Sequence, residues 1–146
     1  MNKQWYALLV SFSLSMALPV GAQQPCPQPR FTGEAPAEYL LMENPVTASR
    51  SALGAGKRLY LGKEKGTGPG CAVCHGNKGD GRGPLASGSD PAPRDFTCER
   101  TVNGIPDGQL FWIIRYGSPN TSMPAHPQFD DEQIWQLVHH LRHLAR

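Results

Sequence analysis

The pentapeptide Cys71-Ala72-Val73-Cys74-His75 constrains this chain of 146 residues more than any other stretch. The spacing C-x-x-C-H is the signal for covalent attachment of c-type haem. Each thiol adds to one vinyl group of the porphyrin, and the two intervening residues let both sulfurs reach neighbouring pyrroles. The adjacent imidazole then faces the iron. We therefore expect one haem c, tethered by Cys71 and Cys74, with His75 as the first axial ligand of its iron.

A zinc site and a thioredoxin-like redox pair are the two other interpretations of the C-x-x-C spacing. A zinc ribbon needs a second close pair of Cys or His ligands, and the sequence has no such pair that would complete one. A redox pair usually follows a strand of a βαβ unit, whereas residues 66–70 read Gly-Thr-Gly-Pro-Gly and predict a loop. Both observations favour haem.

Residues 1–22 have the pattern of a signal peptide. Lys3 gives a positive start, residues 7–18 are a short apolar core, and Val20-Gly21-Ala22 are small or apolar residues before a polar Gln23. We expect cleavage near Ala22 and a periplasmic location, which agrees with haem c because this cofactor is attached outside the cytoplasm. An uncleaved anchor is the alternative, but the apolar run is shorter than the roughly 20 residues that span a bilayer. We expect no membrane span in the mature protein.

Cys26 and Cys98 remain once the haem motif has used the other two cysteines. An exported protein meets an oxidising compartment, where disulfides persist. We therefore favour a disulfide that ties the N-terminal part of the chain to the rest. Two unrelated thiols are the alternative, because sequence alone does not show whether the Cα atoms approach within about 7 Å.

The charge of the chain is nearly balanced. Removal of residues 1–22 takes away one lysine and no acid, which leaves 13 basic and 12 acidic residues. This balance argues against a strongly basic nucleic-acid-binding protein. Basic residues nevertheless gather around the haem motif, and they form either a solvated surface or a docking patch: Lys57, Arg58, Lys63, Lys65, Lys78 and Arg82.

Proline and glycine divide the chain after the signal peptide into an arm and a domain. Residues 23–45 contain five prolines and predict an extended arm, with one possible helical turn over residues 37–42. Residues 46–146 form the expected domain. Its first helix is predicted over residues 48–61, where Leu53, Gly56, Leu59 and Tyr60 recur on one side. A glycine inside a helix is unfavourable, so Gly56 suggests close approach of another helix.

Two further helices are predicted in the second half of the chain. Asp107 is the expected N-cap of a helix over residues 108–116, whose nearly all-round apolar surface requires a large apolar partner such as a porphyrin face. The last helix begins at Asp130, with Gln133 completing a capping box, and has an apolar stripe. No segment alternates apolar and polar residues for long. The pattern predicts an all-α domain of about three to four helices around one haem.

The residue that occupies the sixth position of the iron decides the function of a haem protein. Met123 is the leading candidate, because residues 118–124 are too rich in helix breakers to form a helix and predict a loop that carries a thioether. His126 is the competitor, and Met42 has no comparable setting. Three histidines of the last helix, which are expected on its polar surface or less readily at a metal site, are His139, His140 and His143.

Over residues 44–146 the chain resembles the soluble class I cytochromes c, a monohaem family. The segments that carry the resemblance occur in the order found in the family: Gly56-Lys57-Arg58-Leu59-Tyr60, Cys71-Ala72-Val73-Cys74-His75, Gly83-Pro84-Leu85, Ser122-Met123-Pro124 and Leu137-Val138-His139-His140-Leu141.

This resemblance implies the cytochrome c fold, in which the first and last helices cross, here at Gly56 and Tyr60. It also implies that the Pro84 carbonyl accepts a hydrogen bond from Nδ1 of His75 and raises the basicity of this ligand. Two features depart from the family pattern. His140 stands where an aromatic residue is common, and the proline-rich arm with Cys26 and Cys98 lies outside the minimal pattern.

The resemblance and the residues together predict a periplasmic electron carrier that is not an enzyme. A neutral thioether ligand favours ferrous iron, and a filled coordination shell leaves no place for substrate. The expected partners are a donor and an acceptor redox protein, and no nucleic acid. The alternatives are a haem subunit of a larger oxidoreductase complex, and a haem enzyme or sensor with an open sixth site.

Overall fold

The computed structural model describes residues 25–29 and 32–146, and the predicted signal peptide lies outside this part of the chain. Three helices of ten or more residues form the body of the domain: α2 (Arg50–Tyr60), α5 (Asp107–Tyr116) and α6 (Asp131–Leu144). Four short helical segments connect and flank them: α1 (Ala37–Leu40), α3 (Ala72–His75), the 3₁₀ turn η1 (Ala86–Gly88) and α4 (Glu99–Val102). The described residues contain no strand, so the prediction of an all-α fold is confirmed. No helix within the described ranges is long and apolar enough to cross a membrane.

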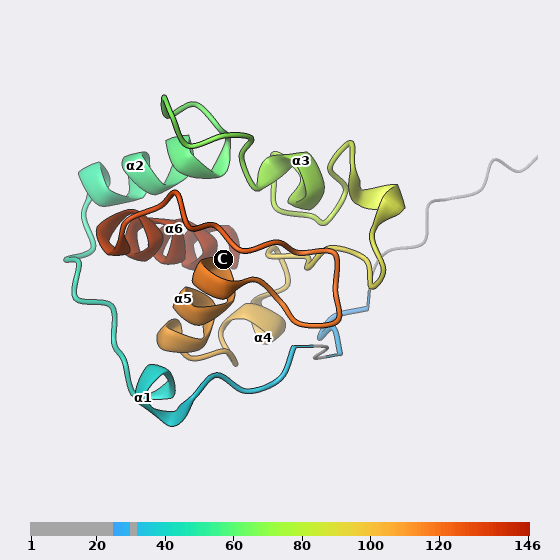
Figure 1. Cartoon of the computed structure of the whole chain (residues 1–146), viewed down its shortest axis with the longest axis horizontal. Coiled ribbons are helices and arrows are strands. Elements are labelled where there is room, and N and C mark those ends of the chain that lie inside the picture. Colours follow the sequence, from blue (N-terminus) through green and yellow to red (C-terminus); the bar gives the residue numbers. More distant parts are fainter. Residues whose placement is uncertain (1–24, 30–31) are drawn as a thin grey trace, which may run out of the picture.

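Helices α2 and α6 lie against each other, with α5 on the other side of α6 (Figure 1). The sequence explains the close approach of the first pair, because Gly56 of α2 sits directly on the α6 backbone. A Cβ atom at this position would lie 2.0 Å from the carbonyl oxygen of Gln136. The predicted crossing at Gly56 is therefore confirmed, and any side chain there would force the helices apart.

His140 occupies the crossing and corrects the expectation that it belongs to a polar helix surface. Its side chain is buried, and its ring meets the buried Tyr60 ring edge-on with centroids 5.0 Å apart. The hydroxyl of Tyr60 in turn donates to the Gly76 carbonyl just after the haem motif. His140 faces inward because the apolar stripe of α6, which includes Leu137 and Leu141, carries it onto α2.

Acid is expected to destabilise the domain through His140. Burial, followed by the nearby charges of His143 and Lys57, lowers the pKa of His140 from 6.5 to about 4. Its Nδ1 has no hydrogen-bond partner among the described residues. The folded state therefore favours neutral His140. The contribution of neutral His140 to the stability of the fold is fully present above the unfolded pKa of 6.5. This contribution is lost as the pH falls through the folded pKa of about 4.

We predict that His140→Phe removes this part of the pH dependence, on the order of 2 kcal/mol of unfolding free energy between pH 7 and 4. Phenylalanine keeps an aromatic ring against Tyr60 and needs no hydrogen bond. Denaturant unfolding of both proteins at several pH values measures the effect. His143→Phe, at an exposed position on the same helix, is the control. An unchanged pH profile in His140→Phe would contradict the prediction.

Helix α6 begins as the sequence predicts, whereas the start of α5 differs from its prediction. Asp130 caps α6, with a reciprocal pair of hydrogen bonds to Gln133 that completes the capping box. Asp107 does not cap α5: Pro106 is its N-cap residue and Asp107 is already helical. The Asp107 carboxylate instead binds Arg142 of α6, with Oδ1 2.6 Å from one guanidinium nitrogen. The negative charge still favours the helix, because it lies in the first turn.

Arg142 fastens the α4–α5 connection to the last helix. Besides Asp107, its guanidinium donates to the carbonyls of Val102 and Ile105. We predict that Arg142→Ala lowers the free energy of unfolding by about 2 kcal/mol, because carbonyl and carboxylate acceptors lose their charged donor. Chemical denaturation measures the loss. Arg142→Lys restores the charge without the planar fork and should recover only part of the stability; full recovery would assign the effect to charge alone.

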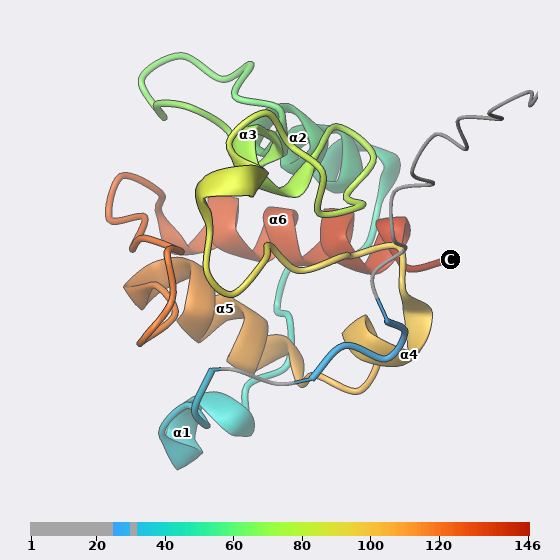
Figure 2. The same ribbon diagram turned by 90° about the vertical axis from the view of Figure 1, so that its right-hand side faces the viewer.

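The N-terminal arm lies along the surface of α5 before α2 begins (Figures 1 and 2). The backbone N–H of Ala35 donates to Oε1 of the buried Gln109, whose Nε2 donates to the Gly33 carbonyl. Further along, the hydroxyls of Tyr39 and Tyr116 are 2.7 Å apart. The predicted helical turn is present as α1. Polar contacts and the stacking of the Tyr39 ring on Phe111 together hold the arm against α5, while Leu41 is exposed.

Candidate functional site

A largely apolar cavity of about 210 Å³ opens between α3, α5, α6 and the loops that follow α3 and α5. Leu110, Ile113 and Ile114 of α5 line it, together with Leu137 and Leu141 of α6. The three α5 residues belong to the apolar surface of this helix that was predicted to need an apolar partner. Trp112 is only half-buried. The cavity leaves this apolar surface of α5 uncovered by other residues, at the place where the sequence analysis expects a porphyrin face.

The haem motif forms one wall of this cavity. Helix α3 contains its last four residues, and Cys71, Cys74 and His75 all line the cavity. Neither cysteine is paired with another cysteine. Burial raises the pKa of the Cys71 thiol to about 11, so this thiol is neutral at physiological pH. The apolar lining around both thiols suits the attachment of an apolar porphyrin edge.

His75 is held in one tautomer. Its Nδ1 lies 2.9 Å from the Arg94 carbonyl oxygen, which can only accept, so Nδ1 carries the proton and Nε2 keeps its lone pair. Burial lowers the pKa of His75, with the hydrogen bond to Arg94 acting in the opposite direction. His75 is therefore a neutral imidazole with one nitrogen available to a metal, which is the form that a haem iron binds.

This hydrogen bond corrects the expectation that Pro84 accepts the Nδ1 proton of His75. The turn around exposed Pro84 packs against the backbone of α3, where Gly83 and Leu85 donate to the Cys74 and Val73 carbonyls. A Cβ on Gly83 would lie 2.4 Å from the Val73 carbonyl oxygen, so only glycine allows this approach. The N–H groups of this turn donate to α3, and the carbonyl that accepts from His75 belongs to the later segment 94–98.

Phe96 explains why segment 94–98 supplies the carbonyl. Its ring stacks on the His75 imidazole, with centroids 4.5 Å apart, and its backbone N–H donates to the Gly79 carbonyl at 2.6 Å. These two contacts fix the chain two residues after Arg94, so the Arg94 carbonyl comes to lie at Nδ1. Sequence reasoning missed both residues. The only available signal was an aromatic residue that ends the glycine- and proline-rich loop.

Met123 lies on a compact loop that also lines the cavity. Two hydrogen bonds close this loop. The Ser118 N–H donates to the Met123 carbonyl, and the Met123 N–H donates to Oγ1 of Thr121. Gly117 has a φ of 81°, and an added Cβ would lie 2.8 Å from the Ala125 nitrogen. The loop brings the thioether to the cavity while Met42, the other methionine outside the signal peptide, does not line it.

His126 reaches the cavity as well, three residues after Met123. Its ring stacks on Phe129, and its Nδ1 is 3.2 Å from Nε2 of Gln128. This amide nitrogen also donates to the Thr67 carbonyl, which identifies it as the donor. Nδ1 of His126 is therefore an acceptor, and the proton of the neutral ring lies on Nε2. Burial lowers the pKa of His126, which favours this neutral form.

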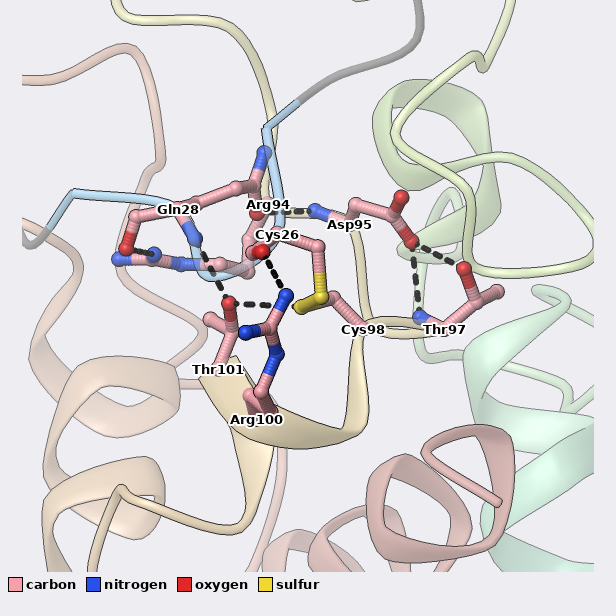
Figure 3. The surroundings of a disulfide bond; sticks show 8 residues. All are labelled: Cys26, Gln28, Arg94, Asp95, Thr97, Cys98, Arg100 and Thr101. Carbon is pink, nitrogen blue, oxygen red and sulfur yellow. Dashed lines mark hydrogen bonds between the residues drawn. A yellow bond between two sulfur atoms is a disulfide. The ribbon is translucent and has the colours of Figure 1, made fainter.

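Cys26 and Cys98 are joined by a disulfide in the structure, with Cα atoms 5.7 Å apart (Figure 3). The bond joins the arm to the last residue of segment 94–98. The histidines of α6 that were considered for a metal site have separate contacts. Nε2 of His139 lies 2.7 Å from the Val46 carbonyl oxygen, and His140 is at the helix crossing. Within the described ranges, no three His, Cys, Asp or Glu side chains gather where they could hold a metal ion.

The geometry defines a class of protein, a small helical domain whose C-x-x-C-H motif lines an apolar cavity. The family model "Cytochrome c" matches residues 54–145, and the chain belongs to the cytochrome c family. Members of this family bind haem c covalently and use it for electron transfer. The donor set fits the cofactor: two unpaired thiols, a neutral imidazole with a free Nε2, and an apolar lining meet at one cavity.

A comparison with solved structures agrees with the family. One similar chain belongs to the Kuenenia stuttgartiensis reducing HAO-like protein complex Kustc0457/Kustc0458, with a TM-score of 0.56 and 25% sequence identity. The match covers 73% of this chain and 49% of that chain, so the present protein spans about half the length of its solved neighbour. No curated protein matches the chain.

Proposed function

We propose that this protein is a periplasmic monohaem cytochrome that carries single electrons between redox proteins, with His75 and Met123 as the axial ligands of the iron. One observation carries the proposal: a single apolar cavity is lined by both thiols of the haem motif, by a tautomerically fixed His75 and by the Met123 loop. Export through cleavage near Ala22 is part of the proposal, because haem c is attached outside the cytoplasm.

The residues of the chain give each part of the site a role. Haem supplies the iron that takes up and releases one electron. Cys71 and Cys74 would hold the porphyrin edge covalently, and His75 would offer Nε2, because its Nδ1–H donates to the Arg94 carbonyl. Leu110, Ile114 and other apolar residues exclude water, which limits the reorganisation that accompanies a change of charge. The site has the features of a rigid carrier.

Met123 is a better sixth ligand than His126 for a structural reason. The Nδ1 lone pair of His126 is used by Gln128, and its Nε2 carries the proton. Ligation by either nitrogen would require a broken hydrogen bond or a moved proton. The Met123 sulfur needs neither change. A neutral thioether also favours ferrous iron, which suits a carrier of relatively high potential.

Carbon monoxide tests whether the sixth position is filled. We expect the absorption spectrum of the reduced holoprotein to stay unchanged under carbon monoxide at neutral pH, because the Met123 thioether already fills the sixth coordination position of the iron. A haem enzyme or sensor with an open site would shift its Soret band at once. Rapid and complete carbon monoxide binding would therefore overturn the carrier proposal and favour the enzyme.

A second candidate function is a haem subunit of a larger oxidoreductase. The similar chain in the reducing HAO-like complex favours this candidate, since that structure is of a complex and the present chain covers about half of its neighbour. Purification of the native protein under mild conditions separates the two. A free cytochrome elutes at the size of one chain, and a subunit elutes with its oxidoreductase.

A further inference from the structure

The first described part of the N-terminal arm, residues 25–29 and 32–35, reaches the haem cavity although it precedes the haem motif by about 40 residues. Gln28 and Thr32 both line the cavity. Neither belongs to the matched family region, which begins at residue 54. The arm thus completes the wall of a pocket whose other walls come from the cytochrome domain itself.

Segment 94–98 and helix α4 hold one end of the arm (Figure 3). Oε1 of Gln28 accepts from the Asp95 N–H at 2.8 Å, and the Gln28 N–H donates to Oγ1 of Thr101 at 2.8 Å. The Arg94 guanidinium donates to the Pro29 carbonyl at 3.0 Å, and Arg100 donates to the Cys26 carbonyl. The Cys26–Cys98 disulfide closes this set of contacts covalently.

The held segment is the one that orients His75. The Arg94 carbonyl accepts the Nδ1 proton of His75, and Phe96 stacks on its ring. Between these two residues, the Asp95 backbone N–H donates to the Gln28 side chain. The Asp95 N–H and the Arg94 carbonyl belong to the same peptide group, so the arm is connected to the His75 imidazole through two hydrogen bonds made by a single peptide group.

The other end of the arm contacts the Met123 loop. The hydroxyls of buried Thr32 and buried Ser118 are hydrogen-bonded, and the Ser118 N–H donates to the Met123 carbonyl. Three residues further, Ala35 is fixed to Gln109 of α5. The described parts of the arm thus contact both the segment that orients His75 and the loop that carries Met123.

We propose that the arm is a strap that closes the haem pocket and that Gln28 is a positioning residue for His75, held in place by the Cys26–Cys98 disulfide. The strap acts on the Arg94 carbonyl, which sets the orientation and basicity of the axial imidazole. A disulfide that stabilised only the whole fold would not single out this hydrogen bond. The inference rests on proposed ligation by His75, and it does not require Met123 to be the sixth ligand.

The test follows the Nδ1 proton of His75 in the reduced holoprotein by hydrogen–deuterium exchange in NMR. We expect the Cys26→Ser/Cys98→Ser double variant to exchange this proton at least tenfold faster than the native protein. Gln28→Ala, which keeps the disulfide, should exchange it faster as well. Imidazole should also bind the ferric double variant faster, because the pocket wall has opened.

A matched control separates positioning from general stability. Ser49→Ala removes the N-cap of α2, whose hydroxyl accepts from the Ala52 N–H, and α2 lies on the opposite side of α6 from α5 (Figure 1). It lowers global stability without contact to the strap. The exchange rates of the His75 proton are compared at denaturant concentrations that give the variants the same free energy of unfolding. Under these conditions the strap variants should exchange the proton faster than Ser49→Ala does.

Equal acceleration in both kinds of variant, or none, would overturn the strap. If the double serine variant does not fold, Gln28→Ala alone decides, since its disulfide is intact. Haem staining of each variant on a denaturing gel shows whether covalent attachment persists. An unchanged exchange rate with haem attached refutes the strap alone, whereas native protein without covalent haem refutes the proposed function.

Discussion

Replacement of Cys71 and Cys74 together by alanine is expected to abolish covalent haem and most of the holoprotein yield. The apolar cavity of about 210 Å³ would then stand without its cofactor, and a domain of this size has little other core to compensate. Haem staining after denaturing electrophoresis measures attachment, and circular dichroism measures the helical content that survives.

The disulfide offers a control for the number of cysteines. Cys26→Ser/Cys98→Ser also removes two cysteines, yet both lie outside the haem motif and should leave covalent haem in place. Stoichiometric covalent haem in the Cys71→Ala/Cys74→Ala protein would contradict the assignment of the motif.

Met123→Ala is expected to lower the reduction potential while haem stays attached through Cys71, Cys74 and His75. Loss of the neutral sulfur ligand to water, or to His126, should lower the potential by at least on the order of 100 mV, within the range that axial ligation controls. Redox titration followed by visible absorption measures the change.

Two variants serve as controls for this potential. Met42→Ala removes a methionine that packs against the core but does not line the cavity, and His126→Ala removes the competing ligand. Both should keep a potential near that of the native protein. If Met123→Ala keeps its potential and His126→Ala becomes high-spin, the iron has two histidine ligands and the carrier works at lower potential.

The backbone architecture followed from local patterns. Apolar residues at helical spacing predicted the ends of α2 and α5 within two residues, and Asp130 with Gln133 marked the start of α6. Gly56 predicted a close helix contact because a glycine inside a helix needs a compensating reason. Such features act over a few residues, so the sequence displays them directly.

The surroundings of His75 were not predictable in the same way. The family resemblance implied Pro84 as the acceptor, but the structure uses Arg94, 19 residues after the histidine. A backbone carbonyl carries no side-chain signature, so its partner depends on the path of a glycine- and proline-rich loop. That path is fixed by Phe96 and Gly79, whose contact is visible only in three dimensions.

His140 illustrates a second limit. A histidine next to His139 on an amphipathic helix suggests solvent, whereas the crossing geometry turns one of the two inward and the other toward the Val46 carbonyl. Neighbours one position apart on a helix point about 100° apart, so the edge of the apolar stripe decides which is buried. The sequence pattern alone places that edge within one residue at best.

The absorption spectrum of the ferric native protein tests the central proposal most directly. We predict a low-spin spectrum with the near-infrared charge-transfer band of methionine sulfur bound to ferric iron at neutral pH. The band should be lost in Met123→Ala and kept in His126→Ala. A high-spin ferric spectrum, or a low-spin spectrum without this band in the native protein, would contradict a carrier with His75 and Met123 as its axial ligands.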